Sequence, residues 1–301
     1  MLATIAVAVV VCGCGAADGG EPTAESPGTQ PSTSETASAS PSPAPNSTPG
    51  PTPSPTLPRL SGPPILGEAP PRWLGKRVLP ETADGFGEVR PTPRELVQRR
   101  FTLPDQLDPL PGRGFASRVD TPAPAEVLAR STWRRGCPVA TSDLSWVRVS
   151  FWGFDDRGHT GELLVNTSVA DDVVTVFRRL YAARFPVEEM RITRRDELDA
   201  PPTGDGNNTG AFACRSTTGG SSYSQHAYGL AIDINPFQNP YLKADLVLPE
   251  LASSYLDRDW VRPGVIRPDD AVVRAFAAIA WRWGGEWRTL KDYQHFSQNG
   301  T

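Results

Sequence analysis

Apolar and polar residues alternate in the middle of the chain with the period of two that half-buried strands require. In WVRVSF, the apolar Val147, Val149 and Phe151 alternate with Arg148 and Ser150. GELLVN follows after a turn centred on DDRGH, so the two segments predict antiparallel strands joined by a hairpin. Further along, EEMRITR indicates another strand.

Two later segments have the apolar spacing of helices instead. The first, SVADDVVTVFRRLYAARF, begins at Ser168, a favourable N-cap residue. Its apolar residues at helical spacing are Val169, Val173, Val176, Phe177 and Leu180. The second is DDAVVRAFAAIAWRWGG, for which Gly284 predicts the end. Its apolar face consists of Phe276, Ile279, Ala280 and Trp283.

From Ser131 onward, strands and helices are mixed without a repeating strand–helix–strand rhythm. This order predicts an α+β domain over residues 131–301, in which a small antiparallel sheet is flanked by helices. The proline-rich residues 64–130 predict an N-terminal extension along this domain, to which no chemistry is assigned. Within it, PTPRELVQRR predicts a helix capped by Thr92 and closed by Glu95 in a capping box. TPAPAEVLARS predicts a second short helix.

The first part of the chain has the features of an export signal and a linker. Residues 1–20 combine an apolar run with small residues, although the usual basic start is missing. Cys14 ends VCGC, which resembles a bacterial lipobox, so a lipid-anchored lipoprotein and a plain cleaved signal peptide both stay open. Residues 21–63 are dominated by Pro, Ser and Thr and cannot bury a core. They predict either an extended tether next to a membrane or a tail without a spacing role.

Composition and charge narrow the classes of function. The chain has 301 residues with 30 basic and 34 acidic side chains, which gives a net charge of −4. This balance does not predict a nucleic acid as the partner. Beyond the leader, no apolar run is long enough to predict a membrane span. A monomer is the default expectation, because the sequence is silent on oligomeric state.

The chain has only three histidines, and two of them lie in short motifs with an aspartate. SYSQHAYGLAIDINP contains His226 and Asp233, and KDYQHF contains Asp292 and His295. A catalytic Zn²⁺ takes three protein ligands and leaves one position open. His226, Asp233 and His295 are therefore candidate ligands, and Asp292 is a candidate general base. In a strand, Asp292 and His295 would point to opposite faces, so the chain must bend between them. On spacing alone, two structural histidines and a solvated aspartate remain the alternative.

The residues around these motifs resemble a known family. SQHAYGLAIDINP is similar to the S-x-H-x-x-G-x-A-x-D signature of the zinc D-alanyl-D-alanine carboxypeptidases of the VanY type, in peptidase family M15. WGGEWRTLKDYQHF is similar to the W-G-G-x-W…D-x-x-H-F ending of the family's endolysin-like branch. GELLVN, FPVEEM and GAFACRS precede these motifs in the family's order, so the resemblance covers about residues 131–296.

This resemblance implies a hedgehog/DD-peptidase fold and a role for each matching residue. The three candidate ligands match the zinc ligands of the family. Asp292 matches the catalytic carboxylate, which is a glutamate in other branches. Arg215, in CRS, matches the arginine that faces the substrate carbonyl and stabilises the oxyanion. Ser224 matches the serine of the motif and is expected to contact the substrate or support a ligand. Without the resemblance, a surface salt bridge would be the favoured interpretation of Arg215.

The cysteines fit an exported protein. Cys12 and Cys14 lie in the leader, which leaves Cys137 and Cys214 in the folded part. Two thiols in an oxidising compartment are expected to pair. This disulfide would anchor the segment that contains Arg215 to the start of the domain.

The remaining histidine and the aromatic residues have separate expectations. His159 lies in the predicted hairpin turn without a metal partner nearby, and a hydrogen-bonded turn histidine is expected. Trp287 and Tyr293 flank the second motif and are candidate walls of a substrate-binding cleft. Trp283, at helical spacing, is expected in the core.

The resemblance leaves three functions open. The first is a zinc D,D-carboxypeptidase that removes a terminal D-alanine from peptidoglycan stem peptides. The second is an endopeptidase that cuts inside the stem, for example between L-Ala and D-Glu. The third is a non-catalytic zinc-binding wall module, as in the hedgehog signalling domains, which the presence of Asp292 and Arg215 argues against. Each predicts an exported protein of the cell envelope, with a membrane anchor if Cys14 is acylated.

Overall fold

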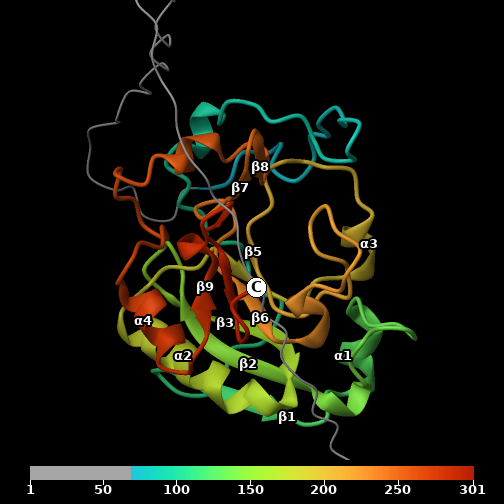
Figure 1. Ribbon diagram of the computed structural model, residues 1–301. Helices are drawn as coiled ribbons and strands as arrows, with labels where there is room; N and C mark the ends of the chain where they lie inside the picture. Colours follow the sequence, from blue (N-terminus) through green and yellow to red (C-terminus); the bar gives the residue numbers. More distant parts are fainter. Residues whose placement is uncertain (1–68) are drawn as a thin grey trace, which may run out of the picture. The chain divides into compact units, whose positions relative to one another are not determined.

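The computed structural model describes residues 69–301 (Figure 1). The export signal predicted for residues 1–20 and the linker predicted for residues 21–63 lie outside the described residues. In the part of the chain that the structure describes, no helix has both the length and the apolar character needed to cross a lipid bilayer.

The described residues contain short strands and few helices, which confirms the predicted α+β class. The strands are β1 (Ser117–Asp120), β2 (Leu144–Trp152), β3 (Gly158–Asn166), β4 (Glu189–Met190), β5 (Asn208–Thr209), β6 (Ala231–Asp233), β7 (Tyr241–Lys243), β8 (Leu246–Leu248), β9 (Arg282–Trp283), β10 (Lys291–Asp292) and β11 (His295–Ser297). The α-helices are α1 (Ala125–Arg130), α2 (Ala170–Ala182), α3 (Arg195–Leu198) and α4 (Ala271–Ala277). The 3₁₀-helices are η1 (Arg94–Leu96), η2 (Thr141–Asp143), η3 (Thr167–Val169), η4 (Gln225–Tyr228), η5 (Ser253–Leu256) and η6 (Gly284–Glu286).

The predicted hairpin forms the centre of the largest sheet. β2 and β3 pair antiparallel along their whole length, and β1 pairs with the other edge of β2. Helix α2 packs on this sheet with α4 beside it (Figure 1). The buried residues of α2 are Ala170, Val173, Val176, Phe177 and Leu180, nearly the set that the helical spacing predicts. Since α2 covers the sheet, the main hydrophobic core lies between them.

Three smaller sheets complete the domain. β6, β11 and β9 form an antiparallel sheet, and β10, β7 and β8 form another. β4 and β5 form a short parallel pair. The predicted single sheet is therefore divided into several, because most of these strands have only two or three residues. β11 lies between β6 and β9, which places His295 at the start of the central strand of its sheet.

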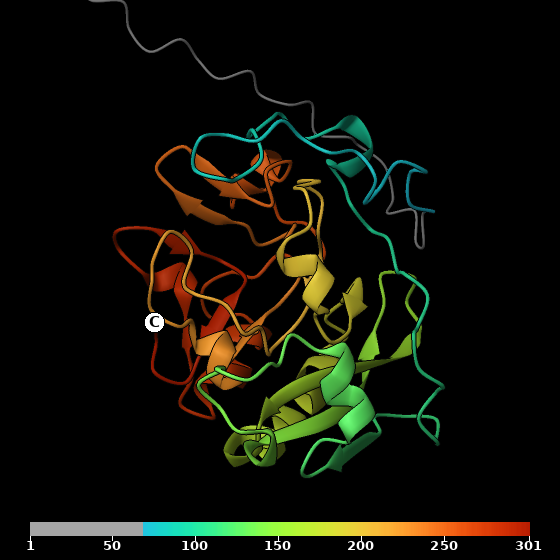
Figure 2. The same ribbon diagram turned by 90° about the vertical axis from the view of Figure 1, so that its right-hand side faces the viewer.

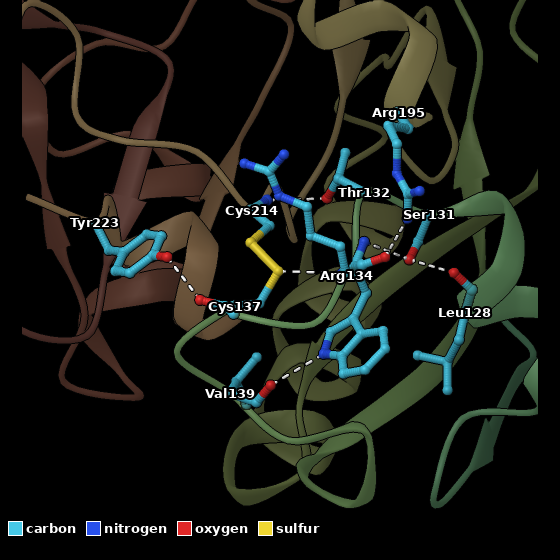
Figure 3. Close-up of a disulfide and its surroundings, with 11 residues drawn as sticks. Leu128, Ser131, Thr132, Arg134, Cys137, Val139, Arg195, Cys214 and Tyr223 are labelled. Carbon is cyan, nitrogen blue, oxygen red and sulfur yellow. Dashed lines mark hydrogen bonds between the residues drawn. A yellow bond between two sulfur atoms is a disulfide. The ribbon is translucent and has the colours of Figure 1, made fainter. Parts of the chain in front are cut away.

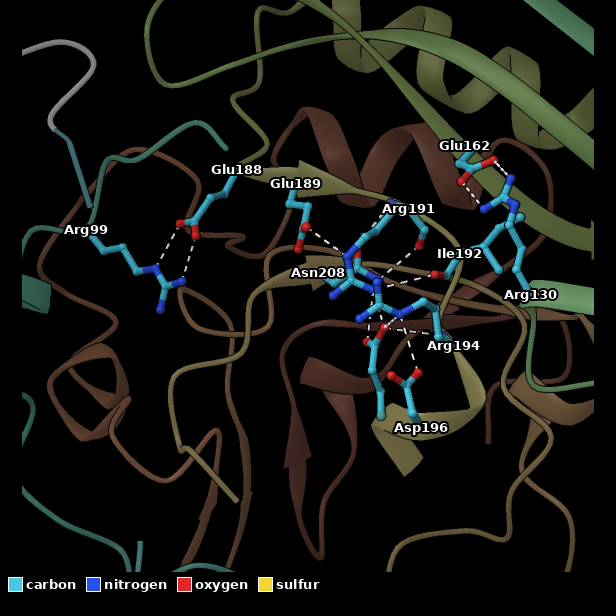
Figure 4. Close-up of polar contacts among 11 residues, drawn as sticks. Arg99, Arg130, Glu162, Glu188, Glu189, Arg191, Ile192, Arg194, Asp196 and Asn208 are labelled. Atoms are coloured by element: carbon cyan, nitrogen blue, oxygen red, sulfur yellow. Dashed lines mark hydrogen bonds and ion pairs between the residues drawn. The ribbon is translucent and has the colours of Figure 1, made fainter. Parts of the chain in front are cut away.

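The N-terminal extension packs closely against the rest of the chain. Figures 1 and 2 show its first part, in blue and teal, beside the hairpin of β7 and β8. Leu96 and Phe101 share a hydrophobic cluster with Phe237 and Tyr255. The guanidinium of Arg99 forms two hydrogen bonds with the buried carboxylate of Glu188, at 2.8 and 2.6 Å (Figure 4). A second buried carboxylate, Glu162 on β3, pairs with Arg130 of α1 in the same view.

Two predicted helix starts are wrong in detail. The segment after Pro93 forms only the three-residue η1, which has no side-chain cap. Thr92 instead donates its hydroxyl to the main-chain oxygen of Leu251 at 2.6 Å, so a tertiary contact uses the predicted cap. Asn166 caps η3 by accepting a hydrogen bond from the main-chain N–H of Ser168, and α2 follows η3 after Val169 without a side-chain cap of its own, so Ser168 is not the cap.

The end of the last predicted helix is also wrong. α4 begins after the N-cap Asp270 and ends at Ala277. Ala280 has a φ of 60°, a left-handed conformation that no α-helix tolerates. The chain then forms strand β9, in which Trp283 is buried as expected. Trp283, which suggested a longer helix, therefore faces the core from a strand, whereas Phe276 faces it from α4.

Cys137 and Cys214 form a disulfide, as predicted from their number and from the export signal (Figure 3). The two residues are 77 positions apart in the sequence. The hydroxyl of Tyr223 donates to the main-chain oxygen of Gly136 at 2.7 Å beside this bond. The disulfide therefore fixes the segment before Arg215 to the loop after α1.

Candidate metal and active site

His226 lies on η4, a single helical turn with a well-defined start and end. Ser224 caps the turn by accepting a hydrogen bond from the N–H of His226 at 3.3 Å. Gly229 ends the turn with a φ of 70°. A Cβ atom at Gly229 would lie 2.5 Å from the main-chain nitrogen of Asn166 on β3. The S-x-H-x-x-G spacing is thus explained by a capped turn that packs directly on the central hairpin.

Asp233 and His295 are brought together by strand pairing. β6 and β11 are antiparallel, and Asp233 is the direct partner of His295 in their register. Direct partners project from the same face of a sheet. The neighbouring pair, Ile232 and Phe296, points the other way and is fully buried in the core. Residues 62 positions apart in the sequence therefore face the same site.

The two imidazole rings are oriented by main-chain oxygens. Nδ1 of His226 lies 2.6 Å from the oxygen of Ala211, and Nε2 of His295 lies 3.3 Å from the oxygen of Thr301. These main-chain oxygens can only accept, so the two ring nitrogens that face them are the donors. The lone pairs of Nε2 of His226 and Nδ1 of His295 then face each other across 3.2 Å. The Asp233 oxygens lie 3.2 and 3.1 Å from the same two nitrogens.

This arrangement of acceptors favours a positive charge at its centre. The three side chains form a cluster whose possible ligand atoms all lie within 4.8 Å of one another. Burial raises the pKa of Asp233, but His226 and His295 lower it more, and the net pKa lies below the ordinary value. Burial lowers the pKa of His295, whereas the Asp233 carboxylate raises it, and the net pKa lies above the ordinary value.

The residues fit a tetrahedral metal ion. Bonds of about 2.0–2.1 Å in tetrahedral geometry separate the ligand atoms by about 3.3 Å. The observed separations between the ring nitrogens and the carboxylate oxygens are 3.1 and 3.2 Å. Two imidazoles and one carboxylate form a ligand set of the kind that binds Zn²⁺ at catalytic sites. The cluster can therefore hold a divalent ion of this type.

Asp292 lies next to this cluster on a different sheet. It is in β10, which pairs with β7, whereas His295 is in β11, so the chain changes sheet between the two residues. Burial raises the pKa of Asp292 to about 7, although the positive charge of His295 acts to lower it. Its Oδ1 is buried and has no hydrogen-bond partner among the described residues. Asp292 is therefore suited to exchange a proton near neutral pH.

A cavity of about 1430 Å³ connects the predicted site residues. His226, Asp233, Asp292 and His295 line it, together with Arg215, Ser224 and Trp287. The ring of Trp287 lies 5.5 Å from that of His295, measured between centroids. The charge of Arg215 lowers the pKa of Asp292, the smallest of the named influences on that carboxylate. A peptide bound in this cavity would be within reach of the Arg215 guanidinium, the Asp292 carboxylate and the cluster of His226, Asp233 and His295.

Tyr293 does not line the cavity, in contrast to the expectation for this residue. Its ring packs against the main hydrophobic core, and the guanidinium of Arg258 lies 4.4 Å from the ring centroid. Tyr293 lies in the bend between β10 and β11, where the chain changes sheet, and it turns toward the core while Asp292 and Gln294 line the cavity.

His159 lies outside the cavity, as expected. Its two ring nitrogens lie 3.0 Å from a carboxylate oxygen of Asp105 and 3.0 Å from one of Asp155. The hydrogen bond with Asp105 raises the pKa of His159 most, and the net pKa lies above its ordinary value despite partial burial. His159 is thus a structural histidine that joins the extension to β3.

Sequence reasoning missed two contributions to the site. Residues 70–72 and 74–76 of the extension line the cavity. The N–H of Gly75 donates to Asp205 at 2.8 Å, which attaches this segment to a loop of the cavity wall. The other contribution is the pair of main-chain oxygens that orient the histidines, and a main-chain group leaves no signature in the side-chain sequence.

The comparisons with known proteins agree with this geometry. Residues 218–298 match the family model described as D-alanyl-D-alanine carboxypeptidase. This segment includes His226, Asp233, Asp292 and His295 but not Arg215. No curated protein and no solved structure matches the chain. The family match supports a peptidase of family M15 that acts on peptidoglycan-type substrates.

Proposed function

We propose that this protein is a zinc-dependent D-alanyl-D-alanine carboxypeptidase that removes the terminal D-alanine from peptidoglycan stem peptides. One observation carries the proposal. The segment that matches the carboxypeptidase family model contains three side chains whose lone pairs converge on one point, with a buried carboxylate beside them. A metal-dependent carboxypeptidase needs both features, a cation to polarise the peptide bond and a base to activate water.

The ligand residues in this proposal are His226, Asp233 and His295. A bound Zn²⁺ supplies a Lewis acid that lowers the pKa of water to about 7. The ring of His226 offers Nε2, and the ring of His295 offers Nδ1, because the other nitrogen of each ring donates to a main-chain oxygen. Asp233 contributes the negative charge that makes the ligand set favourable for a divalent cation.

Asp292 and Arg215 carry the remaining chemistry. The Asp292 carboxylate accepts the proton of the attacking water and later transfers it to the amine that leaves. Its Oδ1 is free for this task, since it has no hydrogen-bond partner among the described residues. Arg215 lines the same cavity and places a fixed positive charge where the peptide oxygen becomes negative. Removal of such a stabilising donor typically costs about 2.7–4 kcal/mol of activation free energy.

The proposal includes a location in the cell envelope. The export signal predicted at residues 1–20 would bring the chain to the compartment where the cell wall lies. The disulfide between Cys137 and Cys214 supports an oxidising compartment. Acylation of Cys14 would attach the domain to a membrane through the linker of residues 21–63.

Mass spectrometry of stem peptides incubated with the protein tests this function. Pentapeptide stems that end in D-Ala-D-Ala are incubated with the protein, with and without a chelator, and the masses of the products are measured. Loss of one alanine that the chelator abolishes is the expected result. Internal fragments would contradict the carboxypeptidase proposal and indicate an endopeptidase of the same family instead. If no stem peptide is cut although the protein binds zinc, the enzymatic proposal fails in favour of a binding module.

A further inference from the structure

We propose that residues 297–301 are a positioning element for the metal cluster, because they present a main-chain oxygen that orients His295. This inference rests on the proposed function in one respect, namely that the cluster of His226, Asp233 and His295 binds a divalent metal. The element is named here the Ser297–Thr301 turn. It begins at Ser297, the last residue of β11, and returns to the ring of His295.

The oxygen of Thr301 is the point at which the turn acts. It lies 3.3 Å from Nε2 of His295 and accepts a second hydrogen bond from the hydroxyl of Ser297 at 3.0 Å. Ser297 is fully buried in β11, so its hydroxyl donates to this oxygen from a fixed position. The oxygen therefore lies between a rigid strand residue and the imidazole ring.

Two further contacts hold the turn in place. Oδ1 of Asn299 accepts hydrogen bonds from both the N–H and the hydroxyl of Thr301, each at 3.0 Å. The indole N–H of Trp287 donates to the main-chain oxygen of Gly300, also at 3.0 Å. The ring of Trp287 in turn packs beside His295. Because contacts from several directions fix the turn, its main-chain oxygen is preorganised rather than recruited by the histidine.

The consequence for metal binding follows from the chemistry of imidazole. A neutral imidazole has one N–H and one lone pair, and the partner of the N–H decides which nitrogen faces the metal. With Nε2 bonded to Thr301, the lone pair of Nδ1 points toward His226 and Asp233. Without this acceptor, the ring could take the other tautomer, which would direct an N–H into the cluster and oppose a cation.

The test compares variants of the full chain that change the turn but not the ligands. The double variant Ser297→Ala/Asn299→Ala removes both side chains that hold Thr301. Affinity for Zn²⁺ is measured by competition with a chromophoric chelator, and Co²⁺ is used as a spectroscopic substitute. Loss of an outer contact to a metal ligand typically lowers affinity 10–100-fold, so we expect at least a tenfold loss and a changed Co²⁺ absorption spectrum. Gln298→Ala, an exposed neighbour in the same turn, is the matched control and should leave both unchanged.

A conservative variant separates positioning from a general loss of structure. Asn299→Asp keeps the side-chain oxygen that accepts from Thr301, so the variant Ser297→Ala/Asn299→Asp should recover part of the lost affinity. Wild-type affinity and an unchanged Co²⁺ spectrum in Ser297→Ala/Asn299→Ala would overturn the inference, as would an equal loss in Gln298→Ala. If the wild-type protein binds neither ion, the metal site of the proposed function fails instead. The two failures are therefore distinguishable.

Discussion

The carboxylate of Asp292 has the surroundings of a proton acceptor and not those of a metal ligand. It lies outside the cluster formed by His226, Asp233 and His295, and its Oδ1 is buried without a partner in residues 69–301. Gly284 approaches it so closely that a Cβ atom there would lie 2.6 Å from the main-chain oxygen of Asp292. Gly284 thus lets the chain pack closely on Asp292, whose carboxylate lies outside the group of candidate ligands.

Replacement of Asp292 should therefore separate catalysis from metal binding. We expect Asp292→Asn to lower kcat/KM for a D-Ala-D-Ala peptide by at least about 100-fold, because general base catalysis contributes about 10²–10⁴. The zinc content after dialysis should stay at the wild-type level, since all three ligands remain. Asp245→Asn, at an exposed position of the β7–β8 hairpin, is the control and should change neither quantity. Wild-type activity in Asp292→Asn would remove this residue from the mechanism.

The raised pKa of Asp292 also predicts how stability changes with pH. Burial raises this pKa from 3.8 to about 7, so between these pH values the folded protein binds a proton that the unfolded chain has lost. Stability then falls as pH rises from about 4 to about 7, and the loss stays constant above that. In the metal-free protein, Asp292→Asn should raise the Tm at pH 8 by at least about 2–4 °C, the shift expected per 1 kcal/mol in this size range.

Thermal unfolding of metal-free wild-type and Asp292→Asn protein, followed by circular dichroism from pH 4 to pH 8, measures this difference. The gain in Tm should shrink as the pH falls toward 4, because Asp292 stays protonated in the folded protein and the unfolded chain takes up the same proton near its pKa of 3.8. A gain that is the same at every pH would show that charge at Asp292 is not its cause.

The candidate site residues could be named from the sequence because the chemistry expected of them is carried by side chains. His226 and Asp233 share one short motif, and Asp292 and His295 share another, so each motif could be recognised locally. Tyr293 could not be placed correctly, because it lies in the bend between β10 and β11 and the change of sheet at this bend is not visible in the sequence. The main-chain oxygen of Thr301 could not be predicted at all.

Among the secondary structure elements, the turn η4 depends most on one residue. Gly229 has a φ of 70° and packs on the backbone of β3, where a Cβ atom would lie 2.5 Å from the nitrogen of Asn166. Gly219 has a nearly identical φ of 69°, but no atom lies within 4 Å of its hypothetical Cβ. The two glycines differ in packing but share the same backbone conformation.

This difference in packing allows the contact between Gly229 and β3 to be tested separately from the strain of a left-handed backbone. Gly219→Ala should cost about 1–2 kcal/mol of unfolding free energy, the penalty for a left-handed L-residue. Gly229→Ala should cost more than that, because the methyl group also pushes η4 away from β3. Since η4 holds His226, Gly229→Ala should weaken zinc binding while Gly219→Ala does not. Urea unfolding and chelator competition measure the two effects, and equal results for the two variants would contradict the packing argument.

Helix and strand lengths show where sequence patterns fail in this chain. The apolar spacing of α2 was sufficient to predict this helix and its buried face, because a long amphipathic helix covers the sheet with one continuous face. The segment after α4 has apolar residues at the same spacing, yet Ala280 adopts φ 60° and the chain forms β9. β9 is held by pairing with β11, a contact that comes from the end of the sequence. Tertiary contacts of this kind override local propensity.

In the molecule as a whole, the extension and the domain share one cavity. Residues 70–72 and 74–76 line it, and Gly75 is bound to Asp205 in the opposite loop. Asp205 also accepts a hydrogen bond from Arg99 through its main-chain oxygen, at 2.7 Å. Arg99 then connects to Glu188, next to β4. One arginine therefore joins the extension, the cavity loop and the start of β4.

Arg99 should contribute strongly to the stability of the fold. Glu188 is fully buried, so Arg99→Ala would leave a buried charge without its cation, and loss of one partner of such a pair costs about 3–5 kcal/mol. We expect a destabilisation of that size in urea unfolding, and faster protease cleavage in the extension. Arg90→Ala is the matched control, because the pair of Arg90 with Glu88 is exposed on both sides and such pairs contribute about 0–1 kcal/mol. If Arg99→Ala unfolds at the wild-type urea concentration, the extension is held by its apolar contacts, with Leu96 and Phe101 as the main candidates.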